Sequence, residues 1–223
     1  MPYTRVFWLA WRDLTLEFRG RAGILSVVFF LAVMLFILGL AFGPNPQDLR
    51  KAAPGVFWVA LAFAGSLLAN RAFGLEVEDG TLDDLLLTSG SREWIYFGKL
   101  LFQLLLLLGV GVLLLIITAG LFYLPLTAWP WYLLTLLLGT LGYAAISTFY
   151  AGMLARLRGR EVLLPLLLFP LVVPVVLSAV RAMGDLATGV PVGEVASWWR
   201  LLAVFDVIYV VACGLLFPNI LEG

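Results

Sequence analysis

Long apolar runs dominate the chain, and polar residues are confined to short stretches between them. A membrane-spanning helix needs about 20 consecutive, mostly apolar residues. Six runs come close to or exceed this length: residues 22–43, 54–70, 94–123, 129–154, 162–180 and 198–217. No linker-like composition and no fixed-period repeat divides the chain. The pattern therefore predicts an all-α integral membrane protein with six transmembrane helices, formed as a single domain over residues 1–223.

The first 21 residues follow a different pattern. Residues 3–21 are too charged to span a bilayer, but their apolar positions recur with a helical period. One face of such a helix would gather Phe7, Trp11, Leu14 and Phe18. The opposite face would gather three arginines diluted by two leucines: Arg5, Arg12, Arg19, Leu9 and Leu16. We expect an interfacial helix that leads into the first span. The alternatives are a generic anchor and a cytoplasmic extension of that span.

The basic residues are distributed unevenly over the connections between the spans. Of the 14 Lys and Arg residues, only Arg50, Lys51, Arg181 and Arg200 fall on the side opposite the N-terminus. The rest lie in the N-terminal arm or in the connections after the second and fourth spans. Cytoplasmic loops of membrane proteins carry an excess of Lys and Arg. We therefore expect both termini, and the acidic stretch at residues 76–91, to be cytoplasmic.

Composition narrows the chemistry that the chain can carry. Hydrophobic residues make up 63% of it, the net charge is zero, and there is no histidine. Histidine is the commonest metal ligand and general base. Cys213 is a lone cysteine in an apolar run, and neither a metal cluster, a catalytic triad nor a carboxylate pair stands out. We expect no enzyme activity, no resident cofactor or metal, and no nucleic-acid partner.

The connection after the second span is unusually acidic. It begins EVEDGTLDDLLL, with five carboxylates within nine positions: Glu76, Glu78, Asp79, Asp83 and Asp84. Gly80 can end the incoming helix, and Thr81 with Asp84 resembles a capping box. Leu82, Leu85 and Leu86 would then form one apolar face. This predicts a short surface helix. Either the acids only keep it in water, or they dock on a basic protein surface, since anionic lipid would repel them.

Two features lie inside the predicted spans. Asp206 is the one carboxylate well within a span, and an Asp at the bilayer centre costs about 2.5–3.5 kcal/mol on insertion scales. It is a candidate intramembrane polar site, or a protonated or hydrogen-bonded side chain facing neighbouring helices. The fifth span contains Pro165, Pro170 and Pro174, which free backbone carbonyls. We expect that helix to pack in the bundle or to line a cavity.

The acidic segment also resembles a known signature. It is similar to the E-x-x-x-G-T-L-E-x-L-L pattern of ABC-2-type permeases, although Thr88–Ser91 replaces the proline that often follows. A narrower match is to the CcmB family, carried by G-P-x-P at residues 43–46, A-P-G-V-x-W-V-A at 53–60, R-x-F at 71–73, D-G-T-L at 79–82 and the proline-rich span LPLLLFPLVVPVV at 164–176. The resemblance covers nearly the whole chain. It implies an ABC-2-like, type V-exporter-like permease.

The resemblance implies a function as well. CcmB proteins are membrane subunits of the haem exporter of c-type cytochrome biogenesis in the bacterial inner membrane. Family partners would be a cytosolic ABC ATPase that binds ATP, a haem-handling membrane subunit, a small accessory subunit and a second copy of this chain. The coupling segment that contacts the ATPase would comprise Glu76, Glu78, Asp79, Gly80, Thr81, Leu82, Asp83, Asp84 and Leu85.

Several alternatives stay open at this point. The subunit could move haem itself, or it could transmit ATP-driven motion that releases a haem-loaded chaperone. A permease of the same architecture could instead export a drug, lipid or glycan. A secondary transporter that uses Asp206 is a third reading. The chain has no G-x-x-x-x-G-K-[ST] motif, so any ATP hydrolysis is expected in a separate subunit.

Overall fold

Helices account for almost all of the chain that the structure describes. The computed structural model describes residues 2–20, 22–78, 80 and 92–220. Seven helices of the described part are long: α1 (Pro2–Gly20), α2 (Ala22–Ala41), α3 (Pro46–Ala72), α6 (Arg92–Leu121), α7 (Trp129–Met153), α8 (Arg160–Thr188) and α9 (Val192–Ile220). Two are short: α4 (Gly74–Glu78) and the 3₁₀ turn η1 (Leu126–Ala128). The described residues contain no strand, and the predicted all-α class is confirmed.

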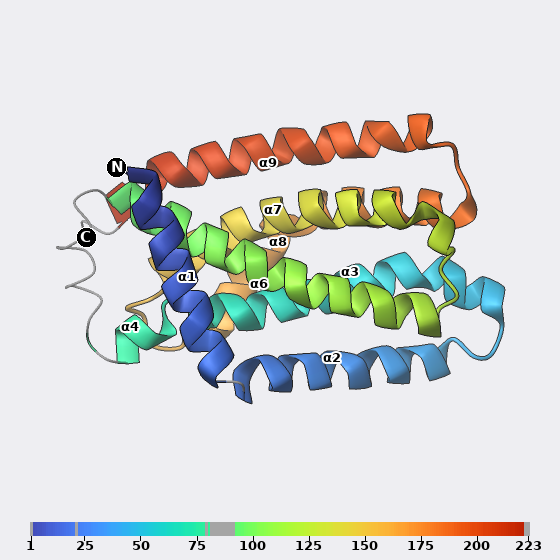
Figure 1. The fold of residues 1–223 in the computed structure, drawn as a ribbon, viewed down its shortest axis with the longest axis horizontal. Helices are drawn as coiled ribbons and strands as arrows, with labels where there is room; N and C mark the ends of the chain where they lie inside the picture. The colour runs from blue at the N-terminus through green and yellow to red at the C-terminus, as the bar shows by residue number, and fades with distance from the viewer. Residues whose placement is uncertain (1, 21, 79, 81–91, 221–223) are drawn as a thin grey trace.

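The six apolar helices run side by side along the long axis of the molecule (Figure 1). Each is long and apolar enough to cross a membrane. The α1 helix crosses the bundle obliquely at one end, and α4 lies at that same end (Figure 1). The six predicted spans are therefore present, with a helix before the first of them.

At the centre of the bundle, α3 and α7 cross closely. A large side chain of each helix packs against a glycine of the other. Trp58 of α3 sits over Gly139 of α7, where an added Cβ would lie 2.2 Å from the indole. In the opposite direction, the ring of Tyr143 covers Gly65, and its hydroxyl donates to the Ala62 carbonyl at 2.5 Å. Small residues let two membrane helices approach closely. These two helices are the most buried of the six spans.

The second predicted span, at 54–70, begins too late. The α3 helix starts at Pro46, because the Asn45 side chain accepts the N–H of Gln47 and the proline occupies the first helical position. Pro54 then lies inside the helix and is buried. The polar residues between Pro46 and Pro54 suggest a loop in the sequence. They are instead the first turns of a helix that extends beyond the apolar run.

The proline-rich helix packs in the bundle, as expected. The α8 helix contacts α3, α7 and α9, while residues such as Leu166, Val173 and Leu177 stay exposed on its outer face. Carbonyls near its prolines receive side-chain donors: the Ser178 hydroxyl donates to the Pro174 carbonyl, and the Tyr209 hydroxyl donates to that of Leu171. Neither carbonyl is one that a proline deprives of its N–H donor, since those belong to Glu161, Leu166 and Pro170, four residues before each proline. The two bonds add side-chain contacts to this part of the helix.

The α1 helix has three faces, where the sequence indicated two. Phe7, Trp11 and Phe18 are exposed, as an interfacial helix requires. Leu9 had counted as a residue that dilutes the polar face. It is instead buried against Gly98 of α6, where an added Cβ would meet the leucine side chain at 2.7 Å. The helix is therefore docked on the bundle through a narrow strip between its aromatic and basic faces.

Candidate functional site

The structure describes only the beginning of the acidic segment. Glu76 and the backbone of Glu78 belong to α4, and exposed Gly80 adopts a left-handed conformation with φ of 68°. The helix thus ends just before the glycine expected to break it. The remaining predicted docking residues lie outside the described residues: Asp79, Thr81, Leu82, Asp83, Asp84 and Leu85. The predicted capping box falls among these.

The position of α4 follows from the way α3 ends. Phe73 leaves the helical conformation, and its N–H bonds back to the Arg71 carbonyl. Its ring is buried and stacks on Phe217 of α9 at a centroid distance of 6.3 Å. The chain then re-enters a helix at once, with the Val77 N–H bonded to the Phe73 carbonyl. A buried aromatic ring therefore fixes the turn from which the acidic segment starts.

Glu76 points into the protein, which corrects the expectation that it faces a partner. It is only 4% exposed. One of its oxygens, Oε1, lies 2.7 Å from Lys99 Nζ and 2.5 Å from Arg12 Nη2. Its carboxylate is therefore occupied by two cations of this chain.

Four charged side chains form the cluster around Glu76: Arg12, Asp13, Glu76 and Lys99, called the ion cluster below. Lys99 is 1% exposed, and its ammonium lies 2.8 Å from Asp13 Oδ2 and donates to the Ala72 carbonyl at 2.6 Å. Arg12 also bonds Asp13 at 2.7 Å. Two cations thus face two carboxylates, and the cluster is neutral.

The ion pairs decide the charge state of Glu76. Burial alone would raise the pKa of its carboxyl, but the neighbouring Lys99 and Arg12 outweigh burial and lower that pKa below its ordinary range. The pKa of the Arg12 guanidinium, which burial alone would lower, is raised by Asp13 and Glu76. Glu76 is therefore ionised at neutral pH.

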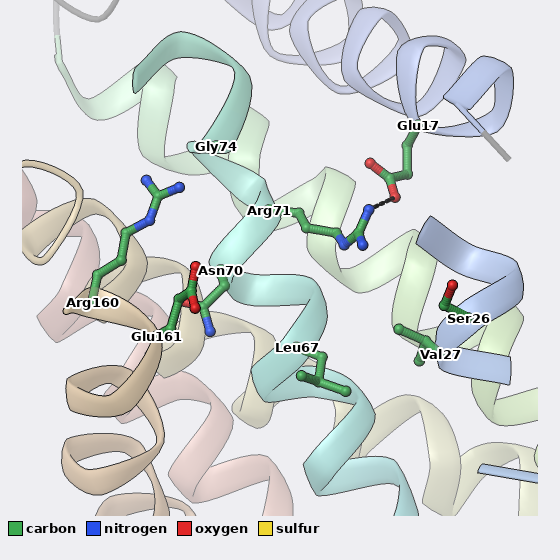
Figure 2. Close-up of a pocket in the computed structure, with 9 residues that line it drawn as sticks. All are labelled: Glu17, Ser26, Val27, Leu67, Asn70, Arg71, Gly74, Arg160 and Glu161. Atoms are coloured by element: carbon green, nitrogen blue, oxygen red, sulfur yellow. Dashed lines mark hydrogen bonds and ion pairs between the residues drawn. The ribbon is translucent and has the colours of Figure 1, made fainter. Parts of the chain in front are cut away.

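The ion cluster joins four elements at one point. Arg12 and Asp13 belong to α1, the Ala72 carbonyl ends α3, Glu76 belongs to α4, and Lys99 lies in the third turn of α6. A second pair joins α1 to α3 nearby, since Arg71 Nη1 lies 3.3 Å from Glu17 Oε1 (Figure 2). The acidic segment consequently starts from a point held by both the N-terminal helix and the bundle.

Sequence reasoning missed three members of this cluster. Arg12 was assigned to a polar face, Asp13 was not singled out, and Lys99 was counted only for orientation. The available signal was Lys99 itself, a lone cation inside the apolar run at 94–123. A charge buried in such a run requires a partner. Nothing in the sequence spacing shows that its partners are 86 residues before it, at Asp13, and 23 before it, at Glu76.

Asp206 lies inside the bundle. It is 3% exposed, and its Oδ1 packs against α7, where an added Cβ on Gly142 would meet it at 2.5 Å and Val175 of α8 at 3.2 Å. Neither oxygen makes a well-formed hydrogen bond within the described chain. The side chain therefore faces neighbouring helices and not the outer surface. Among the described residues no group of three or more His, Cys, Asp or Glu could hold a metal ion.

Comparison with known proteins decides the family. The family model described as "CcmB protein" matches residues 4–222. The chain belongs to the CcmB family. It is 33% identical over 182 residues to Heme exporter protein B of Haemophilus influenzae, covering 82% of each chain. It is 33% identical over 190 residues to the Rhodobacter capsulatus protein of the same name, covering 83% of this chain and 87% of the relative. A Pseudomonas aeruginosa relative is 28% identical over 207 residues.

The family and the six apolar helices together make the chain a multi-pass membrane protein of the permease type. Glu76, the first residue of the segment that resembles the ABC-2-type signature, is held in the ion cluster by Arg12 and Lys99.

Proposed function

We propose that the chain is the membrane subunit of an ABC complex that exports haem, or releases a haem-loaded chaperone, during cytochrome c maturation. The observation that carries this proposal is the match of residues 4–222 to the CcmB model, supported by relatives named Heme exporter protein B. Haem is the cargo here, not a resident cofactor. Residues 1–223 form a single transmembrane domain in the bacterial inner membrane, with both termini in the cytoplasm.

The acidic segment docks on a separate cytosolic ATPase that binds and hydrolyses ATP. Two observations support this proposal. The segment concentrates acids, which suits a basic protein surface. The chain also lacks the G-x-x-x-x-G-K-[ST] nucleotide-binding motif, so a partner must supply the ATPase. Glu78 to Leu85 make the contact, while buried Glu76 anchors the start of the segment through Lys99 and Arg12. Two copies of this chain, a haem-handling membrane subunit and a small accessory subunit complete the complex.

Loss of the gene tests the function directly. In a deletion strain we expect covalently haem-bearing c-type cytochromes to disappear and to return when the wild-type chain is supplied. Staining of membrane proteins for covalent haem measures this. If c-type cytochromes persist in the deletion strain, the chain exports another hydrophobic substrate, such as a drug, a lipid or a glycan.

Charge reversal tests the docking segment. Asp79→Lys with Asp83→Lys should reduce recovery of the ATPase with the detergent-purified complex several-fold, because like charges oppose association. Glu194→Lys is the matched control, since Glu194 is exposed in the first turn of α9, at the opposite end of the bundle. Equal ATPase stoichiometry in the two variants would remove the docking role while leaving the haem-export function untouched.

A further inference from the structure

A cavity of about 540 Å³ opens beside the Arg71–Glu17 ion pair, at the ends of three spans (Figure 2). It lies between the end of α1, the first turns of α2, the last turns of α3 and the first turn of α8. Its polar lining includes two arginines, two glutamates and an asparagine: Arg71, Arg160, Glu17, Glu161 and Asn70. Leu67 of α3 and Val27 of α2 provide apolar wall. The cavity therefore sits at the depth where a membrane-spanning bundle meets lipid headgroups.

The lining holds two arginines and two glutamates, but only one arginine and one glutamate form an ion pair among the described residues. Arg71 is paired with Glu17 at 3.3 Å. Arg160 and Glu161 are neighbours in sequence, but they do not pair with each other or with another described residue. Figure 2 shows the guanidinium of Arg160 turned toward Gly74 and the Glu161 carboxylate turned toward Asn70. The cavity is therefore lined by one cation and one anion, Arg160 and Glu161, that form no ion pair with a described residue.

Two buried polar atoms in the lining also lack partners among the described residues. Nη1 of Arg160 is a donor without an acceptor, and Oδ1 of Asn70 is an acceptor without a donor. The orientation of the Asn70 amide is fixed, because its Nδ2 donates to the Ser66 carbonyl at 3.2 Å. Buried polar groups are almost always hydrogen-bonded, so each of these orphans indicates a missing partner. The missing group must offer acceptors near Arg160 and donors near Asn70.

An apolar stripe on α3 leads into the cavity. Val59, Phe63 and Leu67 recur at four-residue spacing, and each is more than 40% exposed. Phe63 contacts Phe169 of α8 edge-on, at a centroid distance of 5.5 Å, so the stripe runs beside α8. The stripe therefore offers an acyl chain a surface that ends at the polar lining.

We propose that this cavity binds the headgroup of a zwitterionic aminophospholipid, of the phosphatidylethanolamine class. The phosphate accepts from Arg160, the primary ammonium donates to Glu161 and to Asn70 Oδ1, and one acyl chain lies along the stripe on α3. This lipid site is independent of which substrate the complex moves.

The charge of the lining favours this class over other lipids. Two arginines and two glutamates leave the lining neutral, which suits a zwitterion better than a lipid with net negative charge. A choline headgroup has no N–H to donate to Glu161 or Asn70, and it is best received by aromatic rings. None of the described residues that line the cavity is aromatic.

Native mass spectrometry of the purified full-length chain, equilibrated with equal amounts of phosphatidylethanolamine, phosphatidylglycerol and phosphatidylcholine, tests the site. The wild-type chain should retain phosphatidylethanolamine preferentially. Arg160→Gln should lower phospholipid retention several-fold, because the phosphate loses its donor. Arg158→Gln is the matched control, since Arg158 is exposed in the loop just before α8 and is not among the residues that line the cavity.

Two further variants separate the headgroup from the cavity. Glu161→Gln should shift retention from phosphatidylethanolamine toward phosphatidylglycerol, because the lining becomes net positive. Leu67→Trp keeps every charge but fills the cavity, and it should reduce retention of the lipid while the lipid-free chain unfolds at an unchanged temperature. The proposal fails if Arg160→Gln retains lipid as Arg158→Gln does, or if Glu161→Gln keeps the original preference. Haem bound at Arg160 in place of lipid would overturn it too.

Discussion

Lys99 is the residue on which the ion cluster depends. Its ammonium is almost fully buried and is held by Asp13, Glu76 and the Ala72 carbonyl, with the Phe73 ring 5.1 Å away. Desolvating a cation is expensive, and close pairing offsets that cost only when the geometry is good. Removing the cation alone would leave two carboxylates desolvated with only Arg12 between them.

Lys99→Met should therefore destabilise the chain by about 3–5 kcal/mol, the usual cost of leaving a buried charge without its partner. Denaturant unfolding in detergent measures this. The double variant Lys99→Met with Glu76→Gln should recover part of the loss, because Asp13 keeps Arg12 as its partner. Lys51→Met, at an exposed lysine near the other end of the bundle, is the control and should change little. An equal effect at both lysines would refute the structural role of Lys99.

Glu76 should make stability depend on pH in a defined direction. Its pKa is lowered in the folded chain, so its ionic contribution is fully present above its ordinary value of 4.5 and is lost as pH falls through the folded value. Glu76→Gln removes that contribution. The unfolding temperature of the parent should exceed that of Glu76→Gln by a constant margin above about pH 5, and the margin should shrink at lower pH. A margin that grows on acidification would contradict the ion pairing.

At the scale of elements, the crossing of α3 and α7 relies on glycines as much as on large side chains. Gly139→Ala should destabilise the bundle by about 1–3 kcal/mol, because its methyl group would overlap the Trp58 ring. Thermal unfolding in detergent measures the change. Gly109→Ala is the control, since Gly109 lies in α6 with open space around its Cα, and there alanine should be neutral or slightly stabilising. If Gly139→Ala and Gly109→Ala changed the unfolding temperature equally, the Trp58 ring would be free to move away from the added methyl group, and the close packing at Gly139 would not contribute to stability.

The elements also show what the sequence could and could not predict. Apolar runs predicted six spans because lipid-exposed helices must be apolar along their length. The runs did not predict where helices end, since a helix can continue through polar residues once it is capped, as α3 does from Asn45. The acids of the candidate site were visible locally. Their partners were not, because Arg12 and Lys99 reach Glu76 only through packing of α1 and α6.

At the scale of the whole molecule, the ion cluster and the lipid cavity lie at the same end of the bundle. The α1 helix, α4, the ends of α3 and α9 and the start of α8 all gather there (Figure 1). Most of the basic residues belong to this end as well. A permease that receives force from a cytosolic ATPase would need its docking segment on the side that faces that ATPase. The distribution of Lys and Arg indicates the cytoplasmic side.

Site-directed labelling tests this orientation. Cys213 is buried, and Cys213→Ala supplies a cysteine-free background for single cysteines. In intact spheroplasts, a membrane-impermeant maleimide should label Glu194→Cys, in the first turn of α9, and should label Arg158→Cys, before α8, only after lysis. Both positions are exposed, so accessibility to water does not distinguish them. Labelling in the reverse order would place the acidic segment outside the cytoplasm, where no ATPase could reach it, and would overturn the proposed docking together with the orientation.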